Sequence, residues 1–146
     1  MNVCPNITVK EIVCPHIYSK WGDKAIRFID PAIIDTLDVI RNKILKCPIV
    51  INNGVWKQRG RRCNLCGLVV EKTKKNQPYL TSHLLGKAID FSCSRYTVPQ
   101  IHELIKKNAD LLPYKIRLES PIDAPTWVHF DLSTYGQKEK VYVFKA

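Results

Sequence analysis

Four short segments in the second half of the chain alternate between apolar and polar residues, and no other feature restricts the fold as much. Successive side chains of a β-strand point to opposite faces, so a strand with one buried face shows this period of two. Apolar positions such as Ile89 and Phe130 mark the side that faces the core. We therefore expect β-strands over residues 88–92, 115–119, 127–132 and 141–145.

The polar sides of these strands carry Asp90, Glu119 and His129. The three side chains converge if the strands are neighbours. His83 precedes the first strand, on a turn where Gly86 permits close approach of the backbone. Two imidazoles and one carboxylate, from His83, His129 and Asp90, suit a catalytic Zn²⁺ that keeps one position for water. Such an ion polarises a carbonyl, and Glu119 is a candidate proton acceptor beside it.

A helix is expected ahead of these strands. Asp30 is a helix cap with Pro31 at the first helical position, and an apolar stripe at helical spacing continues toward Pro48. Residues 48–51 then have the pattern of a strand. Residues 52–77 are basic and rich in turn formers, which is typical of a long functional loop.

A second helix is expected over residues 97–108, with Thr97 as its cap. His102 and the glutamate after it begin like the HExxH motif of other zinc enzymes, but the second histidine is missing, so we expect His102 to be an exposed helix residue. The length and the order of elements together predict a single α+β domain over residues 1–146.

Composition restricts the partners. The net charge of +10 favours attraction to something anionic, such as nucleic acid, a membrane surface or an acidic cell-wall polymer, although a solubilising surface explains it equally well. No apolar run is long enough to span a membrane, and the N-terminal residues do not have the pattern of a signal peptide. We therefore expect a protein that is cytoplasmic as synthesised.

The six cysteines suggest reduced thiols or metal ligands rather than a disulfide framework. Cys63 and Cys66 have the CxxC spacing of a zinc knuckle, and Cys14 with His16 could complete a structural zinc site of three cysteines and one histidine. The alternative is that these are buried or free thiols. The remaining cysteines are expected to be structural: Cys4, Cys47 and Cys93.

The segment from Thr81 to Asp90 resembles the SxHxxGxAxD motif of zinc D-Ala-D-Ala carboxypeptidases and phage L-alanyl-D-glutamate endolysins, with Thr81 in place of the serine. Residues 127–131 resemble the WxHxD strand of the same family, whose fold is shared by the hedgehog signalling domain. The resemblance implies a small antiparallel sheet with helices packed on one side. It also implies zinc ligation by His83, Asp90 and His129.

The resemblance further implies a catalytic carboxylate, which is Glu119 at a strand end or, as the alternative, Asp123 in the proline-flanked loop that follows. In phage-type members an arginine of the upstream loop binds a substrate carboxylate. We expect Arg62 to have this role, with Arg59 as the alternative. Thr81 is expected to contact the substrate.

The implied function is a monomeric zinc peptidase that cleaves peptidoglycan stem peptides and reaches the cell wall after release or as part of a virion. Nucleic acid is then not expected as a partner. Two alternatives stay open. One is a basic nucleic-acid-binding zinc module that uses the CxxC pair and residues 57–75. The other is a non-catalytic binding domain on the same fold.

Overall fold

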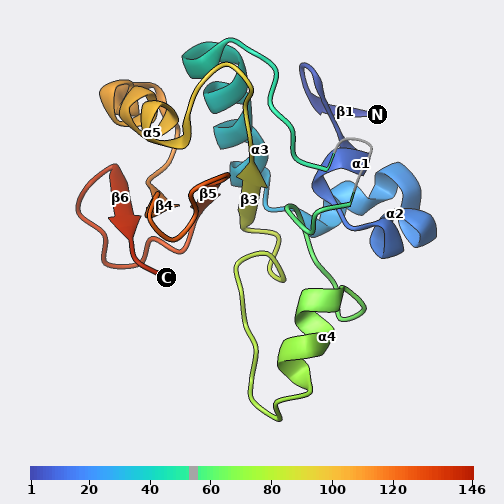
Figure 1. Ribbon diagram of the computed structural model, residues 1–146. Coiled ribbons are helices and arrows are strands. Elements are labelled where there is room, and N and C mark those ends of the chain that lie inside the picture. Colours follow the sequence, from blue (N-terminus) through green and yellow to red (C-terminus); the bar gives the residue numbers. More distant parts are fainter. Residues whose placement is uncertain (53–55) are drawn as a thin grey trace.

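The computed structural model describes residues 1–52 and 56–146, which form an α+β fold (Figure 1). A small N-terminal unit precedes the helices and the main sheet. Its elements are β1 (Asn2–Cys4), β2 (Ile7–Thr8), α1 (Val9–Ile12), α2 (Pro15–Trp21) and the 3₁₀ helix η1 (Gly22–Phe28). The helices that follow are α3 (Pro31–Asp38), the π-helix η2 (Val39–Leu45), α4 (Gly67–Thr73), α5 (Val98–Lys107) and η3 (Ala109–Leu111).

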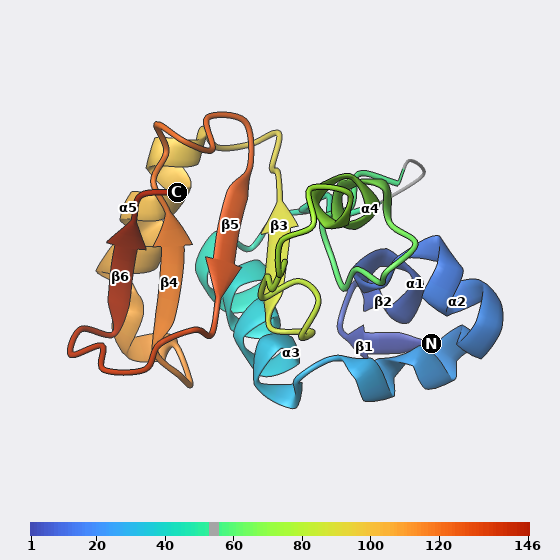
Figure 2. The same ribbon diagram turned by 90° about the horizontal axis from the view of Figure 1, so that it is seen from below.

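The main sheet contains all four predicted strands, β3 (Ala88–Phe91), β4 (Ile116–Glu119), β5 (Val128–Asp131) and β6 (Val141–Phe144). Their order is β3-β5-β4-β6. Strand β5 is antiparallel to both β3 and β4, whereas β6 runs parallel to β4. The prediction of an antiparallel sheet is thus wrong for the last pair. The chain leaves β5 and passes β4 to reach the outer edge, so β6 takes the direction of β4 (Figure 2).

Helices α3 and α5 lie on one side of this sheet, as predicted (Figure 2). The apolar sides of the strands face them, and Phe91 packs edge-on against Phe130 with ring centroids 6.5 Å apart. Asp90 and His129, on the other side of β3 and β5, are also buried, because further chain covers that part of the sheet. The sheet therefore separates an apolar core from a buried polar layer.

Helix α3 begins as predicted, with the Asp30 carboxylate accepting a hydrogen bond from the Ala32 backbone N–H at 3.0 Å. The helical segment ends at Lys46, whose φ of 54° is left-handed. The predicted strand over 48–51 is wrong. Only Val50 pairs there, exchanging two backbone hydrogen bonds with Ser92, because Pro48 has no N–H to donate to a ladder.

The predicted loop over 52–77 contains helix α4, so the prediction of a loop throughout this range is wrong. Helix α4 buries Val69 against the core, and this tertiary contact outweighs the turn-rich composition. Residues 53–55 of the predicted loop lie outside the described residues.

Helix α5 confirms the predicted second helix, and the Thr97 cap is reinforced by a capping box with Gln100. The expectation that His102 is exposed is wrong, since only 2% of its surface is accessible. Helix α5 packs against η2 and β5, and His102 lies on the packed face. Within residues 1–52 and 56–146, neither ring nitrogen of His102 has a hydrogen-bond partner.

The burial of His102 predicts a loss of stability in acid. Burial lowers the pKa of His102 below its ordinary value of 6.5; the charge of Lys106 lowers it further, and that of Glu103 opposes the shift. The unfolded chain then binds a proton at higher pH than the folded chain, so stability falls as the pH drops below about 6.5. We expect His102→Leu to be more stable than the wild type by about 1 kcal/mol at neutral pH, because a buried unpaired polar ring is removed.

Urea unfolding of both proteins at about pH 7.5 and about pH 5.5 measures this effect. The leucine variant should lose less free energy of unfolding between the two conditions than the wild type does. Equal losses in the two proteins would show that His102 does not contribute to the acid sensitivity.

Candidate metal centre

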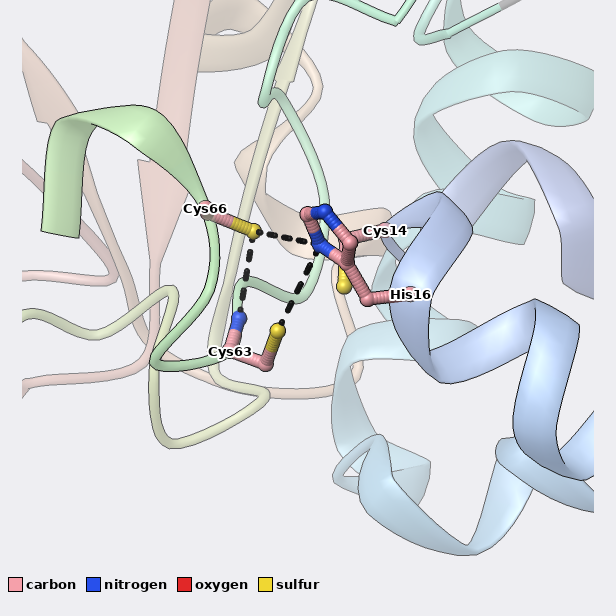
Figure 3. A group of neighbouring side chains, drawn as sticks. All are labelled: Cys14, His16, Cys63 and Cys66. Atoms are coloured by element: carbon pink, nitrogen blue, oxygen red, sulfur yellow. Dashed lines mark hydrogen bonds between the residues drawn. The ribbon is translucent and has the colours of Figure 1, made fainter. Parts of the chain in front are cut away.

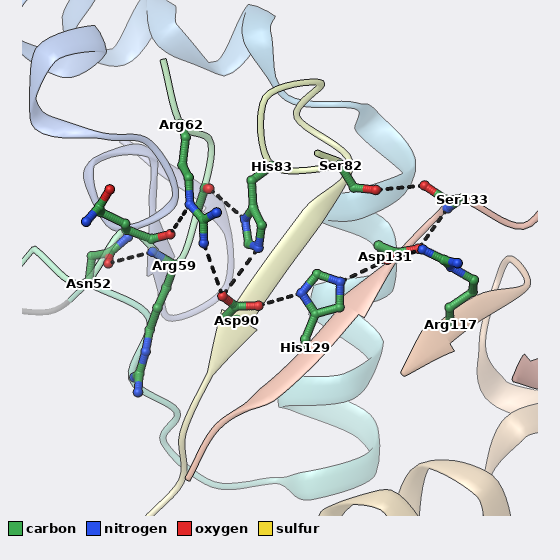
Figure 4. Close-up of polar contacts among 12 residues, drawn as sticks. Asn52, Arg59, Arg62, Ser82, His83, Asp90, Arg117, His129, Asp131 and Ser133 are labelled. Atoms are coloured by element: carbon green, nitrogen blue, oxygen red, sulfur yellow. Dashed lines mark hydrogen bonds and ion pairs between the residues drawn. The ribbon is translucent and has the colours of Figure 1, made fainter. Parts of the chain in front are cut away.

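The register of β3 against β5 sets Asp90 directly opposite His129. Paired residues of neighbouring strands share one face of the sheet, so the two side chains meet there. The Nδ1 atom of His129 lies 2.7 Å from Oδ1 of Asp90 (Figure 4). Both side chains are almost completely buried. The predicted parity of the strands thus brings these two candidate ligands into contact.

His83 reaches the same carboxylate from the turn that precedes β3. Its Nε2 atom lies 3.3 Å from Oδ2 of Asp90. The turn depends on Gly86, whose φ is 69° and where a Cβ atom would overlap the backbone carbonyl of Phe28. The Gly86 carbonyl in turn accepts a hydrogen bond from the Asp30 N–H at 3.0 Å. The candidate ligand atoms of His83, Asp90 and His129 all lie within 4.8 Å of one another.

In each imidazole, the ring nitrogen that faces away from Asp90 already has a hydrogen-bond partner, as in most histidine metal ligands. Nδ1 of His83 lies 2.9 Å from the Gly60 carbonyl, which can only accept, so this nitrogen carries a proton and Nε2 is the nitrogen that could bind a metal beside Asp90. Nε2 of His129 lies 2.9 Å from Asp131. This carboxylate binds the Nε2 proton and leaves Nδ1 for a metal. The donor set therefore fits a divalent cation such as Zn²⁺.

Asp131 is itself held by Arg117 of β4. The Nε and Nη2 atoms of the guanidinium donate to the two carboxylate oxygens, each at 2.9 Å, and the Ser133 N–H donates at the same distance. The roles of Asp131 and Arg117 were not predicted from the sequence. The alternation could have indicated them, since Arg117 lies on the same side of its strand as Glu119, and Asp131 on the same side as His129. Arg117, Asp131 and His129 form a chain that fixes one imidazole (Figure 4).

The electrostatics of this layer favour a bound cation. Burial raises the pKa of Asp90, but hydrogen bonds from His129 and His83 outweigh burial and hold the pKa well below its usual range. Burial lowers the pKa of His129, but its bonds to Asp131 and Asp90 outweigh burial and raise it to about 9. His129 thus lies between two carboxylates that stabilise positive charge. A metal ion supplies that charge in place of the proton.

The structure separates the two candidate arginines. Arg62 is buried, and its Nη2 atom lies 3.7 Å from Oδ2 of Asp90. Its Nε–H donates to the Gln58 carbonyl at 2.6 Å. Arg59 turns away and donates to the Val50 carbonyl and the Ser92 hydroxyl. The geometry therefore favours Arg62 over Arg59 as the arginine at the site.

A cavity of about 450 Å³ opens over the three candidate ligands. Glu119 is half-buried in its wall, and Arg62 and Thr81 also line it. Burial raises the pKa of Glu119, and the charge of His129 opposes this shift. Asp123 is exposed and accepts a hydrogen bond from the Ala146 N–H at 2.9 Å, outside the cavity wall. Of the two candidate bases, Glu119 is the one beside the ligands.

The predicted second set also comes together. Cys14, His16, Cys63 and Cys66 place one candidate ligand atom each within 4.8 Å of the others. The other cysteines lie apart from this set: Cys47 and Cys93 have their sulfurs 3.2 Å apart, and Cys4 is partly buried near the N-terminus. The described residues thus hold two groups of side chains that could bind a metal.

No protein-family model, curated protein or solved structure matches the chain. Among the described residues, no helix has the length and apolar character needed to cross a membrane.

The triad predicts a loss of metal in single variants. His83→Ala and His129→Ala should each lose one bound metal ion per chain, because two protein ligands rarely hold Zn²⁺ tightly. Asp131→Asn should weaken affinity about 10–100-fold by releasing the His129 ring. Elemental analysis and chelator competition measure both effects, with His102→Leu as a control that removes a histidine elsewhere. An unchanged metal content in both alanine variants would refute the assignment.

Gly60 predicts a second effect on the same site. A Cβ atom at this position would overlap the Ile12 carbonyl, so Gly60→Ala should push the backbone away from His83, cost about 1–3 kcal/mol of stability and weaken metal binding. Gly67→Ala is the matched control, since its Cβ would meet nothing closer than 3.9 Å at the start of α4. Unfolding in urea and metal titration test the pair. Similar behaviour of the two variants would contradict the close approach.

Proposed function

We propose that the chain is a zinc-dependent peptidase that hydrolyses the stem peptides of bacterial peptidoglycan. The observation that carries the proposal is the shared cavity, in which the buried triad of His83, Asp90 and His129 lies beside the carboxylate of Glu119 and the guanidinium of Arg62. These are the parts that metal-assisted amide hydrolysis requires: a cation, a proton acceptor and a group that positions the substrate. The resemblance of residues 81–90 and 127–131 to zinc cell-wall peptidases agrees with this combination.

The triad supplies the metal position. His83 through Nε2, His129 through Nδ1 and one oxygen of Asp90 would hold the ion, while Gly60 and Asp131 orient the rings. When bound, Zn²⁺ polarises a scissile carbonyl and makes water more acidic. The protein's own contribution is a rigid donor set that is shielded from bulk solvent.

Glu119 is proposed as the general base and later the general acid. It stands at the end of β4, whose apolar residues Ile116 and Leu118 are fully buried and fix the strand against the core. Its carboxylate can accept the proton of the attacking water and return it to the leaving amine. The raised pKa of Glu119 makes its carboxylate a stronger acceptor for the proton of the attacking water.

Arg62 is proposed to bind a carboxylate of the substrate. Its Nε–H donates to the Gln58 carbonyl, and its Nη2 atom lies 3.7 Å from Asp90 in the cavity that Arg62 lines. Stem peptides carry free carboxylates, which a planar guanidinium binds with two parallel hydrogen bonds. The net charge of +10 favours contact with an anionic wall after the protein is released from the cell or carried there in a virion.

Mass spectrometry of purified peptidoglycan after incubation with the zinc-loaded protein tests the proposal. Loss of a terminal D-alanine would identify a carboxypeptidase. Release of peptides that begin with D-glutamate, with L-alanine left on the sugar, would identify an endopeptidase that cuts between L-alanine and D-glutamate. Both products should disappear with chelator and return with added zinc. Peptidoglycan left intact by zinc-loaded protein at every condition tested would refute the proposal.

The comparison of the two carboxylates assigns the base. Glu119→Gln should keep its fold and metal but lose about two to four orders of magnitude in rate, because only the proton acceptor is removed. Asp123→Asn should cost far less, since Asp123 lies outside the cavity wall. Product formation under single-turnover conditions measures both. An inactive Asp123→Asn beside an active Glu119→Gln would transfer the role to the loop.

The two arginines provide a similar pair. Arg62→Ala should lower kcat/KM by about 10²-fold or more without unfolding the protein, because a desolvated charge-assisted contact is lost. Arg59→Ala removes two hydrogen bonds on the far side of its segment, so it should cost stability and leave kcat/KM nearly unchanged. Peptide hydrolysis and urea unfolding of both variants check this. The opposite ranking in kcat/KM would assign substrate binding to Arg59.

A further inference from the structure

A second group of metal-ligand side chains lies on the opposite side of the segment that carries Gly60 and Arg62. Cys14 and His16 come from the start of α2, and Cys63 and Cys66 from the turn that leads into α4 (Figure 3). His16 and Cys63 are 47 residues apart in sequence, yet Nδ1 of His16 lies 3.6 Å from the Cys63 sulfur and 3.8 Å from the Cys66 sulfur. The cluster therefore joins two distant parts of the chain.

These distances match a tetrahedral metal site. With Zn–S bonds of about 2.3 Å and Zn–N bonds of about 2.1 Å, neighbouring nitrogen and sulfur ligands lie about 3.6 Å apart and neighbouring sulfurs about 3.8 Å apart. All four candidate atoms lie within 4.8 Å of one another. The ring of His16 points its Nδ1 atom at the sulfurs rather than into solvent, although the residue is exposed (Figure 3).

Backbone N–H groups point at all three sulfurs of the cluster. Each accepts a hydrogen bond from a backbone N–H: Cys14 from Ile17 at 3.5 Å, Cys63 from Leu65 at 3.4 Å and Cys66 from Cys63 at 3.3 Å. Backbone N–H donors favour the charged form of the acceptor, which is the form that binds metal. An ordinary buried thiol needs no such arrangement around three sulfurs at once.

We propose that Cys14, His16, Cys63 and Cys66 bind a structural Zn²⁺ that holds the segment of residues 59–62 against the N-terminal unit. Four protein ligands fill the tetrahedral coordination of zinc and leave no position for water, which is the pattern of structural and not catalytic sites. The inference does not depend on the peptidase proposal, because the ligands and the backbone contacts are the same whatever the cavity binds.

The segment that the zinc would fix is shared between the cluster and the candidate metal centre. On one side, the Arg61 N–H donates to the Ile12 carbonyl at 2.8 Å and the Arg61 carbonyl accepts from the Cys14 N–H at 2.9 Å. On the other side, the Asp90 N–H donates to the Arg59 carbonyl at 2.8 Å, and the Arg62 N–H donates to the His83 carbonyl at 3.1 Å. Loss of the zinc should therefore loosen the segment that orients His83 and carries Arg62.

Elemental analysis and cobalt substitution test the site without reference to activity. Wild-type protein purified under reducing conditions should hold about two zinc ions per chain. The double variant His83→Ala/His129→Ala lacks the other centre and should keep one. Its cobalt form should show the thiolate-to-cobalt charge-transfer absorption that only sulfur ligands produce. Cobalt protein without this absorption would overturn the proposal.

Variants of the exposed ligand keep the test independent of folding defects. In the same double variant, His16→Ala should bind cobalt at least tenfold more weakly, and His16→Cys should restore binding, because four thiolates also form a structural zinc site. Cys4→Ser is the matched control, since Cys4 is partly buried like Cys63 but lies outside the cluster, and it should leave the affinity unchanged. Equal affinity in the His16→Ala and Cys4→Ser variants would overturn the assignment.

Hydrogen exchange tests the coupling. In a background that keeps His83 and His129, His16→Ala should speed exchange at the Arg61 and Arg62 amides by at least tenfold, while amides of α5 stay protected. If the His16→Ala protein has lost this zinc and both arginine amides still exchange at the wild-type rate, the structural role of the ion is refuted.

Discussion

The carboxylate of Asp90 is buried between His83, His129 and Arg62, and the arrangement around it depends on balancing that one negative charge. Burying an isolated carboxylate costs several kcal/mol, and the cost is offset only where positive charge and hydrogen-bond donors surround it. Strand β5 brings His129, the turn before β3 brings His83, and the segment after Gln58 brings Arg62. The three elements come from distant parts of the sequence, so the charge of Asp90 is balanced only in the folded chain.

Both imidazoles that contact Asp90 are also held by hydrogen bonds on their opposite side. Asp131 and Arg117 lock one ring through a paired ionic contact, and the Gly60 carbonyl locks the other. A free imidazole rotates between several orientations, and a metal has to select one of them at a cost in entropy. Here the rings are oriented by the fold itself, so little ordering remains for the ion to impose. This property is the one that distinguishes a prepared binding site from a chance cluster of histidines.

Alternation in the sequence was sufficient to predict the four strands and to place Asp90, Glu119 and His129 on one side of the sheet. Alternation could not reveal that β6 lies beside β4, because the order of strands in a sheet depends on the connections between them and not on the local sequence pattern. It also could not assign the arginines, since the direction of the Arg59 side chain is decided by the Val50 carbonyl and the Ser92 hydroxyl, which are distant in sequence.

The misplacement of His102 has a different physical origin. A polar side chain on an amphipathic helix is normally read as exposed, but the packing of α5 on η2 and β5 covers this position. The helix α4 within the predicted loop was missed for the same reason: the burial of Val69 depends on tertiary contacts that composition does not report. Local propensity is a weak guide wherever packing decides the outcome.

The backbone contacts between residues 12–14 and residue 61 determine where a shortened form of this protein could begin. The N-terminal elements from β1 to η1 pair with none of the strands of the main sheet (Figure 1). Yet Ile12 and Cys14 supply the neighbouring chain against which the Arg61 backbone is aligned. A fragment that starts at α3 would keep every candidate ligand of the sheet and lose the support that positions the Gly60 carbonyl. The smallest fragment that keeps the backbone around Gly60 therefore includes the first helices, although none of their side chains lines the cavity above Asp90.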